Sequence, residues 1–232
     1  MSEVATEVEL LGLGDDALIA AQRLAEWVSR APTLEEDVAL ANIALDQLGA
    51  ARMLLAAVGD EDELAYRRDD HQFRNCLLAE LPLGPGRGDL DFGWTMSWLL
   101  MLSAAQLLRY TDLAGGSDEQ AAAIGAKAVK ESTYHLDHAR QWMLRLGGGT
   151  EESQRRVQQG LDGLWPYGHE LTEGIRDRWL AIVEPVLAEA GLKRPDDRWR
   201  PGGGRDGRHT EHLSYLLAEM QSLHRAHPGA QW

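Results

Sequence analysis

The sequence of 232 residues has little cysteine and few basic residues for its acidic content. Cys76 is the single cysteine, so no disulfide can form within the chain, and we expect a reducing, cytoplasmic location. With 23 Lys and Arg against 37 Asp and Glu, the formal net charge is −14. This charge disfavours binding to nucleic-acid phosphates or to an anionic membrane surface. We therefore expect no nucleic acid and no membrane among the partners, whereas a basic protein surface suits the charge.

Targeting segments, long apolar runs and common catalytic motifs are also missing. Residues 1–13 contain no basic segment of the kind that opens a secretory signal. We find no apolar run near the roughly 20 residues that a membrane span needs, and the longest candidate, residues 98–105, contains Ser103. The glycines at 202–204 follow no strand pattern and lack a Lys-Ser/Thr pair, so they do not form a phosphate loop. A Gly-x-Ser-x-Gly motif is absent, which leaves hydrolase chemistry without support.

Helix-forming residues dominate what is present. Ala, Leu, Glu, Gln and Arg are abundant, and long segments repeat apolar residues with the helical period. Alternating strand patterns are absent. The predicted helices cover residues 15–29, 33–58, 70–81, 92–114, 117–146, 150–166, 169–190 and 210–224. Four of them are long enough for a bundle, so the sequence predicts an all-α protein with a four-helix core and accessory helices.

These helices predict one domain over residues 1–232. Thr33 and Glu36 have the spacing of a capping box, which marks the start of the second helix. The Gly- and Pro-rich stretch 194–208 predicts a loop. Residues 209–232 predict a C-terminal helix and tail, too short to form a domain. We expect this extension to dock either on its own domain or on another chain.

Ionisable residues interrupt the apolar stripes of two predicted bundle helices. In the second helix the stripe is Ala39, Ile43, Asp46, Ala50, Met53 and Ala57. In the helix over 117–146 it is Ile124, Ala128, Glu131, His135, His138 and Trp142. The pattern predicts that these ionisable side chains point into the bundle. Because burying a charge costs several kcal/mol unless it is paired, they need partners.

Inward carboxylates and histidines in a four-helix bundle are typical of a di-iron site. Such a site takes one Glu from each of two helices and a Glu-x-x-His pair from each of the other two, because that spacing puts both ligands on one face. Here Gly49 stands three residues after Asp46, and Tyr134 three residues after Glu131. The one acid-x-x-His match joins Asp206 to His209, in the Gly-rich stretch. The expected spacing is therefore missing from the core helices.

Two interpretations of these residues stay open. In one they are structural: Asp46 pairs with a basic or hydroxyl group, Glu131 bonds to His135 four residues on, and His138 joins the same polar cluster. In the other, Asp46, Glu131, His135 and His138 form an atypical ligand set of a di-iron oxygenase or oxidase, or of a ferritin-like metal-handling protein. The missing acid-x-x-His spacing favours the first.

The other candidate residues favour structural roles. Pairs of histidines at 209 and 212 and at 224 and 227 lack further zinc ligands and are expected at helix ends. Cys76 has no basic neighbour in sequence, which predicts a structural thiol. Trp94, Trp98 and Met101 repeat with helical spacing and predict helix core.

Four segments together resemble a known family. They are LEEDVALANIALDQLGAARMLL (34–55), LAYRRDDHQFRNCLLAELP (64–82), AKAVKESTYHLDHARQWMLRLGGGTEES (126–153) and HTEHLSYLLAEMQSLHRAHPGAQW (209–232). The segments are similar to the structural C-subunit family of the bacterial phenylacetyl-CoA 1,2-epoxidase. The likeness covers nearly the whole chain, and the DQLGAAR stretch and the C-terminal segment are its most specific parts.

The resemblance implies a ferritin-like fold and a place in a multicomponent monooxygenase. In that family a catalytic A subunit of related fold carries the di-iron centre and binds phenylacetyl-CoA, and the C subunit pairs with it as a scaffold. A small B subunit and a flavin and iron–sulfur reductase complete the system, which epoxidises the aromatic ring with O₂ and NADPH. The resemblance places Asp46 and Glu131 at degenerate ligand positions. It thus implies that this chain has no catalytic, cofactor-binding or metal-binding residue.

Overall fold

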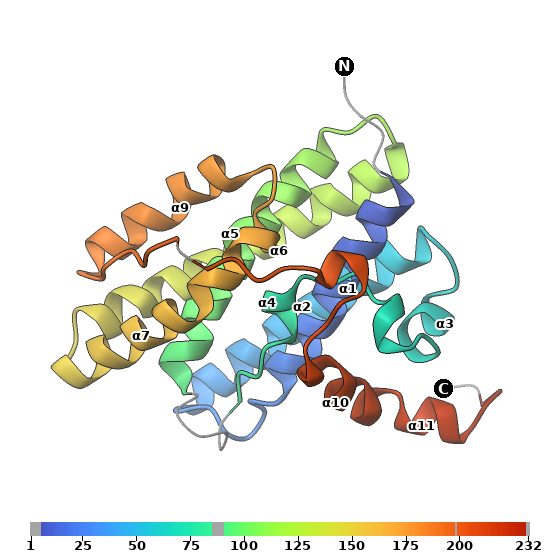
Figure 1. Cartoon of the computed structure of the whole chain (residues 1–232), viewed down its shortest axis with the longest axis horizontal. Coiled ribbons are helices and arrows are strands. Elements are labelled where there is room, and N and C mark those ends of the chain that lie inside the picture. The colour runs from blue at the N-terminus through green and yellow to red at the C-terminus, as the bar shows by residue number, and fades with distance from the viewer. Residues whose placement is uncertain (1–5, 85–90, 198, 231–232) are drawn as a thin grey trace.

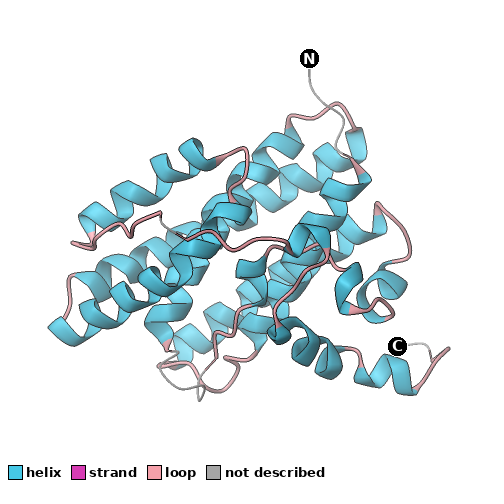
Figure 2. Cartoon of the chain, viewed as in Figure 1, coloured by secondary structure: helices cyan, strands magenta, loops and turns pink. Residues whose placement is uncertain are grey.

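The computed structural model describes residues 6–84, 91–197 and 199–230. Figure 2 shows the described residues as helices joined by loops, and they contain no strand. The terminal Trp232, part of the predicted C-terminal tail, lies outside the described residues.

Four long helices form the bundle: α1 (Glu7–Ala25), α2 (Leu34–Ala56), α5 (Phe92–Ala114) and α6 (Glu119–Gly147). Helix α1 packs along α2, and α5 packs along α6 (Figure 1). Their inner faces contribute to one large apolar core, in which Trp98 is fully buried. The all-α, ferritin-like fold is thus confirmed.

Accessory helices cover the outside of the α5–α6 pair. They include α7 (Glu151–Leu164) and α9 (Arg176–Glu189), which both contact α5 and α6. The indole N–H of Trp179 on α9 donates to the backbone carbonyl of Met101 on α5 at 2.9 Å. This bond fixes α9 against the bundle while Trp179 stays buried.

The C-terminal extension packs on its own chain. Helices α10 (Glu211–Met220) and α11 (Ser222–Ala226) lie beside α3 (Glu61–Tyr66) and η1 (Asp70–Gln72) in Figure 1. The side-chain amide of Gln221 donates to the carbonyls of Ala65 and Arg68 at 3.1 and 2.9 Å. The described part of this segment thus packs on its own domain, one of its two expected docking places.

Capping residues account for most helix starts. Thr33 accepts the N–H of Glu36 as expected, but the Glu36 carboxylate turns to α6 and does not complete the capping box. Thr150 and Ser153 form a reciprocal box at α7, and Thr210 caps α10. The fourth bundle helix, predicted to start at 117, is capped by Asp118. Short polar side chains at these positions bond the free N–H groups of each first turn.

Three predicted helices have other bounds. Helix α1 begins eight residues before the predicted start, at a capping box between Thr6 and Glu9. The helix predicted over 70–81 is only η1 and the single turn α4 (Leu77–Glu80). Residues 169–190 form the short α8 (Gly168–Leu171) and then α9, because Gly174 has φ +76°, outside the helical region.

Helix α2 is more apolar than the sequence pattern indicated. By length and composition it could cross a membrane, since an 18-residue stretch has a mean hydropathy of 1.3. About 44% of that stretch is buried inside the bundle. The expectation that no apolar segment approaches membrane length is therefore wrong for α2, although a bundle helix of a soluble protein passes the same test.

Candidate functional site: the polar centre of the bundle

Two glutamines meet at the centre of the bundle. The amide of Gln47 on α2 donates to Oε1 of Gln106 on α5 at 2.7 Å, and the amide of Gln106 donates back to Oε1 of Gln47 at 2.8 Å. Both side chains are buried. The two amides therefore satisfy each other without carrying any charge.

His135 of α6 joins this pair and is also buried. Its Nδ1 lies 3.4 Å from the amide nitrogen of Gln47, which has hydrogens to donate, and its Nε2 lies 3.1 Å from Oδ2 of Asp46. These partners fit a neutral ring protonated at Nε2. Burial lowers the pKa of His135, and the hydrogen bond to Asp46 opposes that shift only in part.

The carboxylates at the α2–α6 boundary take separate partners. Asp46 was expected to point into the bundle centre. Its side chain is instead partly exposed and contacts His135 from the edge of the α2–α6 interface. Glu131 lies 3.5 Å from Lys127 and not against His135, so the expected intrahelical Glu131–His135 pair is replaced. Burial raises the pKa of Glu131.

His138 contacts Glu36, which the sequence pattern assigned to a capping box and not to this polar cluster. Its Nε2 lies 3.1 Å from Oε2 of Glu36, and both side chains are nearly buried. The angles do not form a hydrogen bond, so both atoms stay without a hydrogen-bond partner. The ring of Tyr134 lies edge-on to His135 and tilted against His138, with centroids 6.3 Å from each.

The residues of α2 and α6 that face the bundle centre differ from the predicted ones. A Cβ added at Gly49 would meet nothing within 4 Å, and Tyr134 is exposed, so neither position three residues after Asp46 or Glu131 faces the bundle centre. The buried pairs at this spacing are Gln47 with Ala50 and Ser132 with His135, shown in the burial pattern of α2 and α6.

The sequence search missed Gln47 and Ser132 because it looked only for carboxylates. A search for any polar residue three positions before a histidine finds Ser132-x-x-His135 directly. On α2 the same register has Gln47 and Ala50 in place of an acid and a histidine. Among the described residues, no group of three or more His, Cys, Asp and Glu side chains is placed to hold a metal ion.

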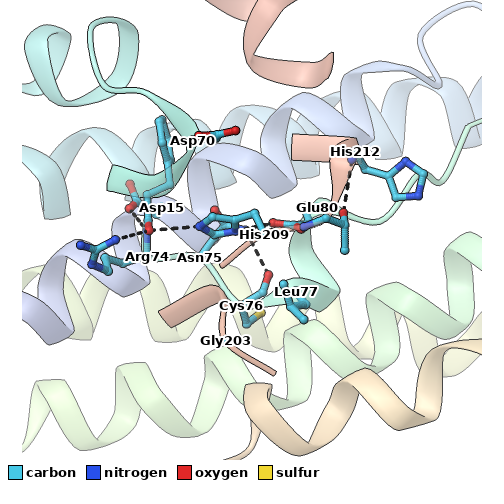
Figure 3. A network of polar contacts seen from close by, with 12 residues as sticks. Asp15, Asp70, Arg74, Asn75, Cys76, Leu77, Glu80, Gly203, His209 and His212 are labelled. Atoms are coloured by element: carbon cyan, nitrogen blue, oxygen red, sulfur yellow. Dashed lines mark hydrogen bonds and ion pairs between the residues drawn. The ribbon is translucent and has the colours of Figure 1, made fainter. Parts of the chain in front are cut away.

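A second polar network ties the C-terminal segment to the bundle (Figure 3). The Glu80 carboxylate is fully buried and accepts from the side-chain amide of Asn75 at 2.8 Å and from the N–H of Thr210 at 2.6 Å. Nδ1 of His209 lies 2.7 Å from Glu80, and its Nε2 lies 3.1 Å from the carbonyl of Phe73. Both ring nitrogens face acceptors, and the carboxylate raises the pKa of His209 against the effect of burial.

The predicted loop at 194–208 carries a partly buried arginine of the same network. Arg205 lies in a short 3₁₀ helix, η3 (Gly204–Asp206), and contacts Asp16 of α1 at 2.5 Å. It also donates to the carbonyls of Gly12 and Arg74 at 2.9 and 2.7 Å. This stretch therefore bridges α1 to the C-terminal segment, and it is built from specific contacts.

The remaining candidate residues lie in structural positions. His209 and His212 are at the start of α10, and His224 and His227 are at the end of α11, as predicted. Cys76 is buried at the start of α4, and burial raises the pKa of its thiol well above the usual value. A buried thiol with a raised pKa has little reactive thiolate, which agrees with the structural interpretation.

A surface cavity lies away from the bundle centre. It has a volume of about 770 Å³ and lies between the first turns of α1 and the end of α5. Arg109 and Arg205 contribute to its lining, but Arg109 donates to the carbonyl of Glu173 and Arg205 to Asp16. Both guanidinium groups thus have partners within the chain.

Comparison with known proteins shows the family of this chain. A family model described as phenylacetic acid catabolic protein matches residues 3–174 and 171–232. The chain belongs to this family. It is similar to the C subunit of the 1,2-phenylacetyl-CoA epoxidase of Escherichia coli (strain K12), with 43% identity over 246 aligned positions. The alignment covers 96% of this chain and 97% of the relative, so the likeness extends over the whole fold.

Proposed function

We propose that this chain is a non-catalytic structural subunit of a phenylacetyl-CoA ring epoxidase in aerobic phenylacetate breakdown. The similarity to the C subunit of such an epoxidase over nearly the full length supports the assignment to the complex. The observation that carries the non-catalytic role is the reciprocal pair of Gln47 and Gln106. The pair puts buried neutral amides between α2 and α5, whereas a di-iron bundle needs inward carboxylates from its helices.

The chemistry of these donors disfavours a di-iron centre in this chain. A bundle of that type surrounds two iron ions with carboxylates and two histidines. Around His135 the inner positions hold two neutral amides, a serine and an alanine. The buried carboxylates of α1, Asp15 and Asp16, pair with Arg68 and Arg205. Neutral amides that bond to each other cannot balance the charge of two cations. We therefore place the di-iron centre in a partner subunit.

In this proposal the chain pairs with the catalytic A subunit and stabilises it. A small B subunit and a reductase complete the complex, which works in the cytoplasm. The formal net charge of the chain, −14, fits a partner with a basic docking surface. The alternative is a di-iron oxygenase or oxidase that uses Asp46, Glu131, His135 and His138 as an atypical ligand set.

Iron loading tests the two alternatives. The purified chain is exposed to ferrous iron under anaerobic conditions, desalted, and assayed for iron by elemental analysis, with the catalytic subunit as the positive control. We expect near-zero iron per chain, against about two per catalytic subunit. About two irons per chain, lost on Asp46→Ala or Glu131→Ala, would overturn the non-catalytic role.

Co-expression tests the place in the complex. An affinity-tagged catalytic A subunit from the same organism is produced together with the untagged chain, and the pair is analysed by size exclusion. We expect both chains to elute together in constant proportion, as a stable subunit pair does. Elution of the chain by itself at all concentrations would contradict the assignment to this complex.

A further inference from the structure

Helix α2 has two apolar faces, and only one of them is covered. Its inner face packs in the bundle through residues such as Leu40, Ile43 and Leu54, all fully buried. On the opposite side of the helix lies an outer stripe formed by Leu34, Val38, Leu45 and Leu48, which are between 40% and 75% exposed. Among the described residues, ten large hydrophobic side chains are exposed, and this one stripe gathers four of them.

The spacing of the outer stripe indicates which kind of structural element can pack on it. Leu34, Val38, Ala41, Leu45 and Leu48 follow one another at intervals of four and three residues. This alternation keeps a single apolar line along one side of a helix and matches the seam of a coiled coil. At 1.5 Å per residue the line is about 21 Å long. The matching occupant of such a seam is another helix with the same spacing of apolar residues.

The flanks of the stripe indicate the charge of that helix. Beside the stripe α2 carries the exposed carboxylate of Glu35 and the half-buried one of Asp37. Its one basic residue, Arg52, already pairs with Glu61. A second copy of the same stripe would bring acidic flanks against acidic flanks, which costs free energy. An anionic membrane surface meets the same repulsion. A helix flanked by Lys and Arg complements the stripe.

We propose that the outer stripe of α2 is the docking site for a helix of the catalytic subunit, with apolar side chains at three- and four-residue intervals and basic flanks. This inference rests on the function proposed above. A standard interface buries about 800 Å² on each partner, more than one helix stripe supplies. Tyr134 of α6, 52% exposed and next to the histidine that contacts Asp46, is a further exposed aromatic side chain at the α2–α6 boundary.

Charge substitutions in the stripe test this proposal. The full-length variants Leu45→Glu and Leu48→Glu are titrated against the purified catalytic subunit, and the dissociation constant is measured by interferometry. We expect each to weaken binding about 30-fold or more, the loss typical of a buried apolar contact at an interface centre. Leu223→Glu on α11, where the leucine is 50% exposed, is the matched control and should change binding less than about threefold. Circular dichroism should show the same helix content in all variants.

The outcomes separate this proposal from the function on which it rests. If the wild-type chain does not bind the catalytic subunit, the proposed function fails. If the wild type binds and both stripe variants bind equally well, the function stands and the docking site is wrong. Sedimentation equilibrium and flotation with anionic vesicles complete the test. If the chain forms a dimer or binds vesicles, and Leu45→Glu abolishes this, the stripe binds a second copy or a membrane. That result would overturn the proposal that it binds a helix of the catalytic subunit.

A second pair of variants tests the charge of the partner. In Glu35→Lys an exposed carboxylate beside the stripe is reversed, whereas in Glu211→Lys an exposed carboxylate of α10 is reversed as the control. We expect Glu35→Lys to slow association with the catalytic subunit several-fold at low salt and to reduce its salt dependence. Faster association of Glu35→Lys would contradict a basic flank on the partner helix.

Discussion

The side-chain amides of Gln47 and Gln106 bond to each other in both directions, at 2.7 and 2.8 Å, between α2 and α5. Each amide is thus the main partner of the other in a buried environment. A group buried without its partner costs free energy, whereas removing both partners together can be nearly neutral. The pair therefore behaves as a unit.

This coupling can be measured with a double-mutant cycle. Gln47→Leu or Gln106→Leu alone should lower the free energy of unfolding by about 1–3 kcal/mol, because one amide stays buried and unsatisfied. The double variant should cost less than the sum of the two. Urea unfolding of the four proteins gives the coupling free energy. Strictly additive losses would show that the reciprocal bonds do not stabilise the protein.

The neutral state of His135 gives a second prediction. Because burial lowers its pKa, the ring should titrate below the ordinary 6.5 and carry its proton on Nε2 near neutral pH. Asp46→Asn removes the partner that raises the pKa, so this variant should titrate lower still. Nitrogen-15 NMR of the labelled ring reports both the tautomer and the pKa. A ring protonated on both nitrogens at pH 7 would contradict the assignment.

His209 should show the opposite dependence on pH. Its folded pKa is raised by Glu80, so its contribution to stability is fully present below the unfolded value of about 6.5. That contribution is lost as the pH rises through the raised folded pKa. The difference in unfolding free energy between the wild type and His209→Gln should therefore shrink from pH 5.5 to pH 8.5. Urea titrations at several pH values measure it, and a difference that grows with pH would refute the charged pair.

The fold was largely predictable from periodicity, because the bundle helices carry apolar stripes and clear caps. Helix α1 was only partly predictable: its first turns carry exposed Glu7 and Glu9 and resemble a tail until the Thr6 cap is recognised. The segment around Cys76 was missed for a different reason. It has a helical composition, but its N–H groups bond to Asp16 and Glu170 of distant helices in place of local carbonyls. Such tertiary contacts leave no periodic pattern.

The sequence predicted which helices form the candidate site, but not which residues of α2 face the bundle centre. His135 was found because it interrupts an apolar stripe and is buried as expected. Asp46 was placed inward, yet on α2 both sides are apolar, so periodicity alone could not decide which stripe faces the core. Gln47, one residue on, is the inner residue. The exposed stripe makes a second side of α2 apolar. The same stripe indicates a docking surface.

Close packing of α5 and α6 supplies the last prediction. A Cβ at Gly125 of α6 would lie 2.6 Å from the backbone nitrogen of Ala114 and 2.8 Å from the carbonyl oxygen of Tyr110, both on α5. Backbone atoms cannot move away cheaply, so Gly125→Ala should lower the free energy of unfolding by about 1–3 kcal/mol. Gly49→Ala is the matched control, since a Cβ there meets nothing within 4 Å. In that helix interior alanine should instead stabilise by about 0.5–1 kcal/mol. Urea unfolding of both variants checks the signs, and a Gly125→Ala protein as stable as the wild type would mean that the two helices are not in close backbone contact at this point.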